Sequence, residues 1–278
     1  MSERGVGASI PRKEDDRFLH GGGQFVPDVQ IPGMWHAAFR RSQVAHGRLR
    51  GITVPKGVEG QVFTSTDLSD VKPIRSTASF PGFKPSDFPV LAKDKVRYVG
   101  EQIAIAVAPT RAEAEDIADA IEVDCEQLPA IYDLNQAREP GVAVIHEPWG
   151  DNVFCETSFE NGDIEAAKNA AAHTISRQFR LARQTPFPME GRGCCAHYDS
   201  RLDELVVWMS HQLPHPMQRG IAEFLGLDIN KVRVICPDVG GGFGLKTHLD
   251  GESVAVSWVS LKLGRPVKWV QDCFEHLV

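Results

Sequence analysis

The sequence lacks a long apolar segment, an excess of positive charge and any C-x-x-C cysteine pair. No run of apolar residues approaches the ~18 that a membrane-spanning helix needs, which argues against a membrane protein. Lysine and arginine number 30 against 37 aspartate and glutamate residues, so the formal net charge is −7. A chain of this charge has no general attraction to nucleic acid or anionic lipid. We therefore expect neither a nucleic-acid partner nor a membrane partner.

The cysteines and the N-terminus indicate a reducing compartment. The chain has six cysteines without disulfide-framework or iron–sulfur spacing, and the charged opening Met1–Arg4 lacks the apolar core of a signal peptide. We expect a cytoplasmic protein. Cys194 and Cys195 are adjacent and cannot both turn toward one metal, so we interpret them as two small buried residues.

Two histidines have the spacing of a zinc-binding pair but not the backbone for it. His211 and His215 are four residues apart, as on one face of a helix. Pro214 and Pro216 exclude the helix that would present both imidazoles together. We expect no metal ligands among the protein side chains.

The composition is that of an ordinary globular protein. With 278 residues, of which 42% are hydrophobic, the chain is long enough for one large domain or two smaller ones. Strand and helix patterns occur in both halves, which favours an α+β fold. Strands are expected at 34–39, 102–108, 122–126, around 175–181, and at 205–209, 232–236 and 267–270; helices are expected after the caps Thr110 and Asp163 and at 216–225 and 252–263; the proline-containing stretch 72–89 is expected to be a surface loop.

A glycine-rich segment, Asp238 to Gly244, follows the strand predicted at 232–236. Glycine lets backbone amides approach a ligand because no Cβ intervenes, so the segment is a candidate cradle for an anion or cofactor. A tight turn without a ligand is an equally good interpretation. Common nucleotide motifs do not fit, since a P-loop or a dinucleotide fingerprint needs glycine where Leu245 and Thr247 stand. We therefore disfavour an independent nucleotide-binding enzyme.

Two further clusters carry polar side chains. Residues 183–193 hold Gln184, Glu190 and Arg192 on a stretch that two prolines keep extended, and residues 210–216 hold the two histidines. Taken alone, residues 183–193 are more typical of a loop with solvated charges than of a binding site.

In this order, the clusters resemble the molybdenum hydroxylase family, that is, the large molybdopterin-binding subunit of xanthine dehydrogenase, aldehyde oxidoreductase and aerobic carbon monoxide dehydrogenase. Residues 36–46 and 96–101 resemble its small α/β hammerhead domain. Pro188-Met189-Glu190, Arg192-Gly193 and the segment 238–246 resemble the first half of its cofactor-binding region. The resemblance implies an α+β fold with an N-terminal loop plus hammerhead domain at 1–135 and the first half of a molybdopterin-binding domain at 136–278.

The resemblance also implies roles for particular residues. Gln184 matches the glutamine that approaches the apical oxo ligand of molybdenum, and Phe243 lies in the loop against the metal centre, so both are candidate catalytic residues. Gln184, Gly241, Gly242, Phe243 and Gly244 are the candidate cofactor-binding residues. The implied cofactor is molybdopterin with molybdenum, which we expect in its cytosine dinucleotide form.

Two departures from the family pattern shape the expected function. Purine-oxidising members have a glutamate just after the lysine of the glycine loop, whereas this chain has Thr247, which disfavours xanthine as substrate. The family's catalytic base is a glutamate near the far end of the large subunit, and no glutamate of this chain matches it. We expect a second large-subunit polypeptide, or a C-terminal region, to complete the active site.

The expected function is therefore that of one part of a larger oxidoreductase. The resemblance implies hydroxylation of an aldehyde or N-heterocyclic small molecule with water-derived oxygen, and electron transfer to iron–sulfur and FAD subunits of a hetero-oligomer. A scaffold or relic module that only contacts partner subunits is the alternative. We also expect poor solubility of the isolated chain, because strands 232–236 and 267–270 would lack part of their cover.

Overall fold

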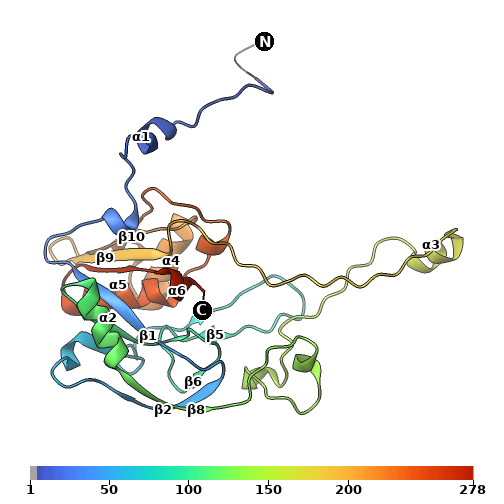
Figure 1. The fold of residues 1–278 in the computed structure, drawn as a ribbon, viewed down its shortest axis with the longest axis horizontal. Coiled ribbons are helices and arrows are strands. Elements are labelled where there is room, and N and C mark those ends of the chain that lie inside the picture. Colours follow the sequence, from blue (N-terminus) through green and yellow to red (C-terminus); the bar gives the residue numbers. More distant parts are fainter. Residues whose placement is uncertain (1–4, 278) are drawn as a thin grey trace.

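A computed structural model describes residues 5–277 of the chain. Its centre is a mixed sheet that joins strands from both halves of the sequence (Figure 1). Along the sheet the seven strands follow the order β11 (Val232–Ile235), β10 (Glu204–Met209), β9 (Gly193–Asp199), β12 (Val267–Val270), β1 (Trp35–Arg41), β7 (Gln102–Ala108) and β3 (Val62–Thr64). Because β12 and β1 are hydrogen-bonded in parallel, N-terminal and C-terminal strands share one ladder.

Two smaller sheets complete the strand content of the described residues. One has the order β6 (Lys95–Val96), β2 (Gly47–Thr53), β8 (Glu122–Gln127), and the other pairs β4 (Ile74–Arg75) with β5 (Asp87–Phe88). The α-helices are α1 (Asp15–Leu19), α2 (Arg111–Ala120), α3 (Ile164–Ala170), α4 (Pro214–Leu225), α5 (Gly251–Leu263) and α6 (Cys273–His276). Six short 3₁₀ turns connect them: Val26–Asp28, Glu59–Gln61, Gln136–Arg138, Glu147–Trp149, Ile229–Lys231 and Leu245–Thr247.

Helix α5 forms the centre of the larger hydrophobic core. Apart from Glu252 and Lys262, its residues are apolar or small on all sides, and a helix of that kind is stable only when it is buried all round. Residues 252–260 are all buried, and the helix packs against β9 and β12. Edge-to-face pairs of Phe63 with Trp258, at 5.5 Å between ring centroids, and of Phe39 with Trp269, at 5.7 Å, fill the space between α5 and the sheet. The core therefore contains residues from both halves.

The predicted α+β architecture is confirmed, and several elements have the predicted bounds. β7 and β12 run over the predicted residues. Thr110 and Asp163 cap their helices as predicted, each accepting a hydrogen bond from a first-turn amide. The adjacent Cys194 and Cys195 are buried in the sheet, as interpreted. Helix α4 begins at Pro214, two residues before the prediction, because proline lacks only a backbone donor that the first turn does not use.

Three expectations differ from the structure, and β9 is among the strands that were not predicted. The stretch 72–89, expected to be a surface loop, contains the two-residue strands β4 and β5. Residues 175–181 form no strand, and their apolar side chains are exposed. β9 was not predicted, since its small residues, Gly193 to Ala196, lack the β-branched pattern of a strand but fit a position buried on both faces. The predicted lack of cover over 267–270 is wrong, because β12 lies between β9 and β1 and its first three residues are buried.

Candidate functional site

The glycine-rich segment leaves the end of β11 and runs into the 3₁₀ turn Leu245–Thr247. Three of its residues have left-handed backbones: Gly241 with φ +100°, Phe243 with φ +52° and Gly244 with φ +89°. Phenylalanine rarely adopts this region, and such strain is concentrated at functional sites. The Phe243 side chain is 74% exposed, so the core does not impose this conformation by burying the ring.

Close neighbours require the absence of side chains on this loop. A Cβ on Gly240 would lie 2.5 Å from Glu190 Cβ, and one on Gly242 would lie 2.5 Å from the Gln212 side chain. A Cβ on Gly241 would meet Phe243 Cε2 at 2.9 Å and Pro188 Cβ at 3.1 Å. These glycines allow the loop to pack against residues 188–190 and 212, and they explain the glycine pattern without a ligand.

The amides in the middle of the loop are available for a ligand. Gly240 N donates to Glu190 Oε2 at 2.7 Å, and Gly244 N donates to Gln212 Oε1 at 3.2 Å. Between these two anchors, the N–H groups of residues 241–243 have no acceptor among the described residues. Three consecutive unpartnered donors on a fixed loop fit a group that presents oxygen or sulfur acceptors.

A buried cluster of Lys246, Ser210 and Glu190 holds the glycine-rich loop in place. Lys246 Nζ donates to Ser210 Oγ at 2.7 Å, to Glu190 Oε2 at 3.1 Å and to Glu190 O at 2.8 Å. Ser210 Oγ donates to the same Glu190 oxygen at 2.5 Å. Burial lowers the pKa of Lys246, and the Glu190 carboxylate opposes that shift. Glu190 thus connects the ammonium group, the hydroxyl and the Gly240 amide.

The sequence singled out the segments that carry this cluster but not the pairing within it. Lys246 belongs to the predicted glycine-loop motif, and Ser210 belongs to the predicted cluster at 210–216, without any predicted partner. A carboxylate is a common partner of a buried lysine, but no local signal pairs Glu190 with Lys246, because 56 positions separate them.

The other predicted site residue lies elsewhere. Gln184 is exposed on the stretch that precedes Glu190 and makes no hydrogen bond within residues 5–277. The structure brings Phe243 and the glycines together in one loop, and Pro188 reaches that loop, but it does not bring Gln184 to it. The proposed role of Gln184 therefore stays a prediction.

The histidine cluster does not assemble in the described residues. His211 is buried before α4; its Nδ1 accepts from Leu213 N at 3.1 Å, and its Nε2 lies 3.2 Å from His248 O. Burial lowers the pKa of His211. His215 is exposed on α4, and residues 5–277 contain no group of three or more histidine, cysteine, aspartate or glutamate side chains placed to hold a metal.

A cavity of about 710 Å³ lies beside the C-terminal end of the loop, where Thr247 contributes to its wall. It is also lined by an ion network in which Arg41 and Arg192 both donate to Glu252 Oε1, at 3.0 and 3.1 Å, and Arg41 also donates to Glu275. Burial acts to raise the pKa of Glu252, but the two guanidinium groups outweigh it and hold that pKa below its ordinary value. This network joins β1, α5 and α6.

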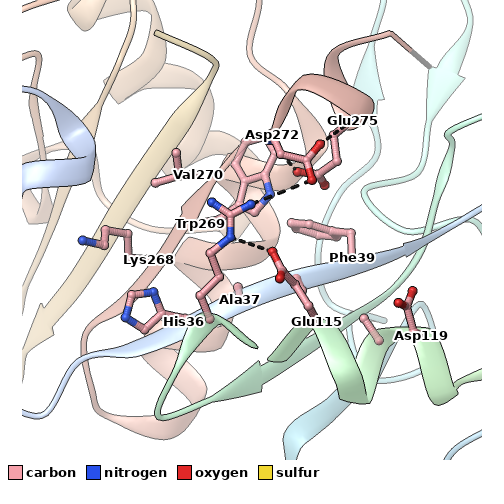
Figure 2. A pocket seen from close by; sticks show the side chains of 13 residues that line it. His36, Ala37, Phe39, Glu115, Asp119, Lys268, Trp269, Val270, Asp272 and Glu275 are labelled. Carbon is pink, nitrogen blue, oxygen red and sulfur yellow. Dashed lines mark hydrogen bonds and ion pairs between the residues drawn. The ribbon is translucent and has the colours of Figure 1, made fainter. Parts of the chain in front are cut away.

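A second pocket, of about 300 Å³, is lined by residues of β1, α2, β12 and α6 (Figure 2). His36 and Lys268 line it, and Arg111 donates to Glu115 Oε1 within it at 2.6 Å. The Lys268 ammonium points away from Glu115 and donates to Pro27 O and Val29 O. Burial, with the charges of Lys268 and Arg111, lowers the pKa of His36. Residues 240–244 line neither of these two cavities, so the loop is selected as the candidate site by its unpartnered amides and not by cavity size.

Most of the chain matches two family descriptions. Residues 20–129 match "Aldehyde oxidase and xanthine dehydrogenase, a/b hammerhead domain", and residues 145–278 match "Molybdopterin cofactor-binding domain". The second match contains the glycine loop and the Lys246–Glu190–Ser210 cluster. No helix within residues 5–277 is long and apolar enough to span a membrane.

Individual relatives agree with these matches. The nicotine 6-hydroxylase large subunit of Paenarthrobacter nicotinovorans is 37% identical over 279 residues, which cover 98% of this chain and 34% of that protein. The nicotinate dehydrogenase large molybdopterin subunit of Eubacterium barkeri is 30% identical over 258 residues, which cover 91% of this chain and 58% of that protein. The crystal structure of quinoline 2-oxidoreductase from Pseudomonas putida 86 matches with a TM-score of 0.91 and 35% identity, over 98% of this chain and 35% of that chain.

The chain spans about a third of the length of the nicotine 6-hydroxylase subunit and of the quinoline 2-oxidoreductase chain. Hammerhead and cofactor-binding matches follow one another in the order that the resemblance implied. The chain therefore belongs to the molybdenum hydroxylase family and corresponds to the N-terminal portion of its large, molybdopterin-binding subunit.

Proposed function

We propose that this chain supplies one wall of the active site in a molybdopterin-dependent hydroxylase, and that further large-subunit polypeptide completes that site. The observation that carries the proposal is the row of three unpartnered N–H groups at residues 241–243, held between the anchored amides of Gly240 and Gly244. Molybdopterin with molybdenum, when bound, supplies the two-electron oxidation of the substrate. The chain's own contribution is a set of preorganised donors that need no rearrangement on binding.

Within this proposal each predicted residue has a role toward the cofactor. The amides of Gly241, Gly242 and Phe243 donate to its acceptor atoms, and Gly244 lets the chain turn away through its left-handed backbone. Phe243 and Gln184 lie against the reacting centre, Gln184 once its exposed stretch is ordered by the completing polypeptide. The cofactor that these residues would hold is the cytosine dinucleotide form, and iron–sulfur and FAD subunits would accept the electrons from substrate oxidation.

The proposed substrate is an aldehyde or a small N-heterocycle. Nicotine, nicotinate and quinoline, which appear in the names of three relatives, are all N-heterocycles, and this supports the heterocyclic class. Thr247 in place of an acidic side chain leaves no carboxylate after Lys246 for a purine to bind. Oxygen derived from water enters the product.

We also propose a domain boundary at residues 135/136. The two family matches end at 129 and begin at 145, which supports a boundary between those positions. The first unit, 1–135, is the N-terminal loop with the hammerhead domain, and the second, 136–278, is the first part of the cofactor-binding region.

The test is cofactor retention in the complex formed with the proteins encoded beside this chain's gene. Gly242→Val should lower the molybdenum content of the purified complex at least tenfold, because a side chain at 242 must displace the Gln212 side chain, whose Oε1 accepts from the Gly244 amide and anchors the loop. Gly51→Ala is the matched control, since a Cβ at Gly51 meets no atom within 4 Å. Nucleotide released from the complex by acid should contain cytidine.

Turnover separates this function from that of a non-catalytic scaffold. Phe243→Ala and Gln184→Ala should each reduce hydroxylation of an N-heterocyclic substrate at least tenfold while the complex still assembles. Unchanged turnover in both variants would favour the scaffold, and equal molybdenum content in Gly242→Val and the unaltered complex would contradict the cofactor loop.

A further inference from the structure

The stretch between α3 and the candidate site projects away from the body of the protein, as Figure 1 shows. We call residues 171–189 the basic arm. It contains Arg177, Arg180 and Arg183 and no acidic residue, although the whole chain carries a net charge of −7. Its large apolar side chains are exposed: Ile175 by 75%, Phe179 by 85% and Leu181 by 94%.

Most of the basic arm makes no backbone–backbone hydrogen bond in the described part of the chain. Between residues 172 and 185 no amide or carbonyl is hydrogen-bonded to another backbone group. At the C-terminal end the arm is anchored, because His276 Nε2 lies 2.8 Å from Pro186 O and the Phe187 ring packs edge-to-face on the His276 ring. The arm thus has one fixed end beside the glycine loop and a free extended backbone before it.

Sequence and structure disagree on this stretch in an informative way. Thr174, Ile175, Phe179 and Leu181 give residues 174–182 the composition of a strand, yet the structure leaves them unpaired and exposed. A strand-forming segment with free backbone groups and exposed apolar side chains is a template for pairing with another strand. To form a strand, residues 174–182 need the edge of a neighbouring sheet with which their backbone can pair.

We propose that residues 174–182 become a β-strand by pairing with an edge strand of the large-subunit polypeptide that lies outside the third matched by this chain. This inference rests on the proposed function, since it identifies the surface through which that polypeptide completes the site. A strand of nine residues would extend about 30 Å. Arg177 and Arg180 would lie on opposite faces of this strand, so we expect acidic side chains on both faces of the partner edge.

Two observations favour the remaining large-subunit polypeptide as the pairing partner. The nicotine 6-hydroxylase subunit continues over about two thirds of its length outside the aligned region, so polypeptide of the right kind exists in a relative. The arm also leads directly into Pro188 and Glu190, which contact the glycine loop, so a polypeptide completing that loop must approach here. A second copy of this chain is disfavoured because its arm carries the same three positive charges.

The first test is hydrogen exchange of the full chain, alone and in complex with the polypeptide that completes the large subunit in its own genome. Amides of 174–182 should exchange at least tenfold more slowly in the complex than in the free chain. A complex that contains molybdenum but leaves these amides unprotected would overturn the pairing and leave the proposed function intact. Protected amides in a complex without molybdenum would support the pairing and contradict the proposed function.

The second test removes single backbone donors. Neighbouring amides of a strand point in opposite directions, so one of Arg177→Pro and Gln178→Pro must remove a donor that faces the partner. That variant should lower recovery of the complex at least tenfold relative to Arg177→Ala or Gln178→Ala. Leu202→Asp, an exposed apolar site in the turn after β9, is the control and should assemble normally.

Three results would contradict the proposed pairing. Full recovery with both proline variants, or failure of the chain to recover any large-subunit polypeptide, would overturn the proposal. Protection of the arm in the free chain that rises with its concentration would assign the edge to a second copy instead.

Discussion

Glu190 determines how the glycine loop is held. Its carboxylate accepts from the Gly240 amide and from two buried side chains, Ser210 and Lys246, while the Lys246 side chain has no exposed surface. A buried ammonium is tolerated only when its charge is paired. The same pairing that stabilises the lysine therefore fixes the start of the loop.

Removal of the Glu190 carboxylate should be strongly destabilising. Glu190→Ala leaves Lys246 buried and unpaired, and we expect a loss of about 3–5 kcal/mol in the free energy of unfolding. Urea denaturation of the free chain measures this. Glu165→Ala is the control, because the Glu165–Lys168 pair is exposed and should contribute less than about 1 kcal/mol. Equal losses in both variants would contradict a structural role for the buried pair.

Glu252 should make the free energy of unfolding depend on pH. Its pKa in the folded chain lies below the ordinary 4.5, because Arg192 and Arg41 outweigh the effect of burial. A carboxylate of lowered pKa contributes stability above its unfolded pKa, and that contribution is lost as the pH falls through the folded pKa. The free energy of unfolding should therefore fall below about pH 4.5.

Comparison with Glu252→Gln isolates this effect. The amide does not titrate, so the variant should lose less stability between about pH 5 and pH 3 than the unaltered chain. Burial and the charge of Glu252 both raise the pKa of Asp250, so the comparison is made in an Asp250→Asn background, where only the group at position 252 differs in titration. Parallel pH profiles would show that Glu252 does not titrate as stated.

At the scale of elements, local sequence signals are strongest where side chains satisfy a helix end. Thr110 accepts a hydrogen bond from Glu113 N, and the Glu113 carboxylate accepts one from Thr110 N, which together form a capping box. The helix that follows, α2, packs on β1 and β7. Its start was predicted from the sequence because both partners of the cap lie within four residues.

Loss of this cap should weaken α2 by a modest amount. Thr110→Ala removes the side-chain acceptor, and we expect a decrease of about 1 kcal/mol in the free energy of unfolding. Thermal denaturation followed by circular dichroism measures it. Thr77→Ala, at an exposed position in the loop between β4 and β5, should change the stability by less than about 0.5 kcal/mol. A larger loss of stability in Thr77→Ala than in Thr110→Ala would contradict the role of Thr110 as the cap of α2.

At the scale of the whole molecule, one sheet passes through both halves of the sequence. β12 is hydrogen-bonded to β1 on one side and to β9 on the other, and Trp269 packs on Phe39 across that junction. The two units proposed from the family matches therefore share a ladder and a core. Such a continuous core favours cooperative unfolding.

Truncation of Trp269 should destabilise both halves together. Trp269 is 2% exposed, and Trp269→Ala should cost about 3–5 kcal/mol through the cavity that it leaves. Hydrogen exchange should show a parallel loss of protection in β7 and in β10, which lie on opposite sides of the junction. Loss of protection confined to β10 would indicate two independent folding units.

Solubility also depends on the whole molecule. We still expect poor solubility of the isolated chain, because large apolar side chains are exposed on the basic arm and also outside it, for example Phe159 by 87% and Phe274 by 84%, whereas β12 is covered. Leu181→Asp should therefore reduce light scattering at high protein concentration, whereas the same change at Leu202, outside the arm, should have little effect. A monodisperse unaltered chain at high concentration would contradict this expectation.

The sequence by itself determined the α+β class, the caps of α2 and α3, the apolar strands β7 and β12, and the glycine loop with its family resemblance. Each of these depends on residues close together in the chain, where backbone preference and hydrophobic pattern act directly. The tertiary structure alone decided that Lys246 meets Glu190 across 56 positions and that β9 lies inside the sheet. It also decided that the basic arm is left unpaired. Such outcomes depend on which distant segments pack together, because burial and ion pairing act through space and leave no local sequence period.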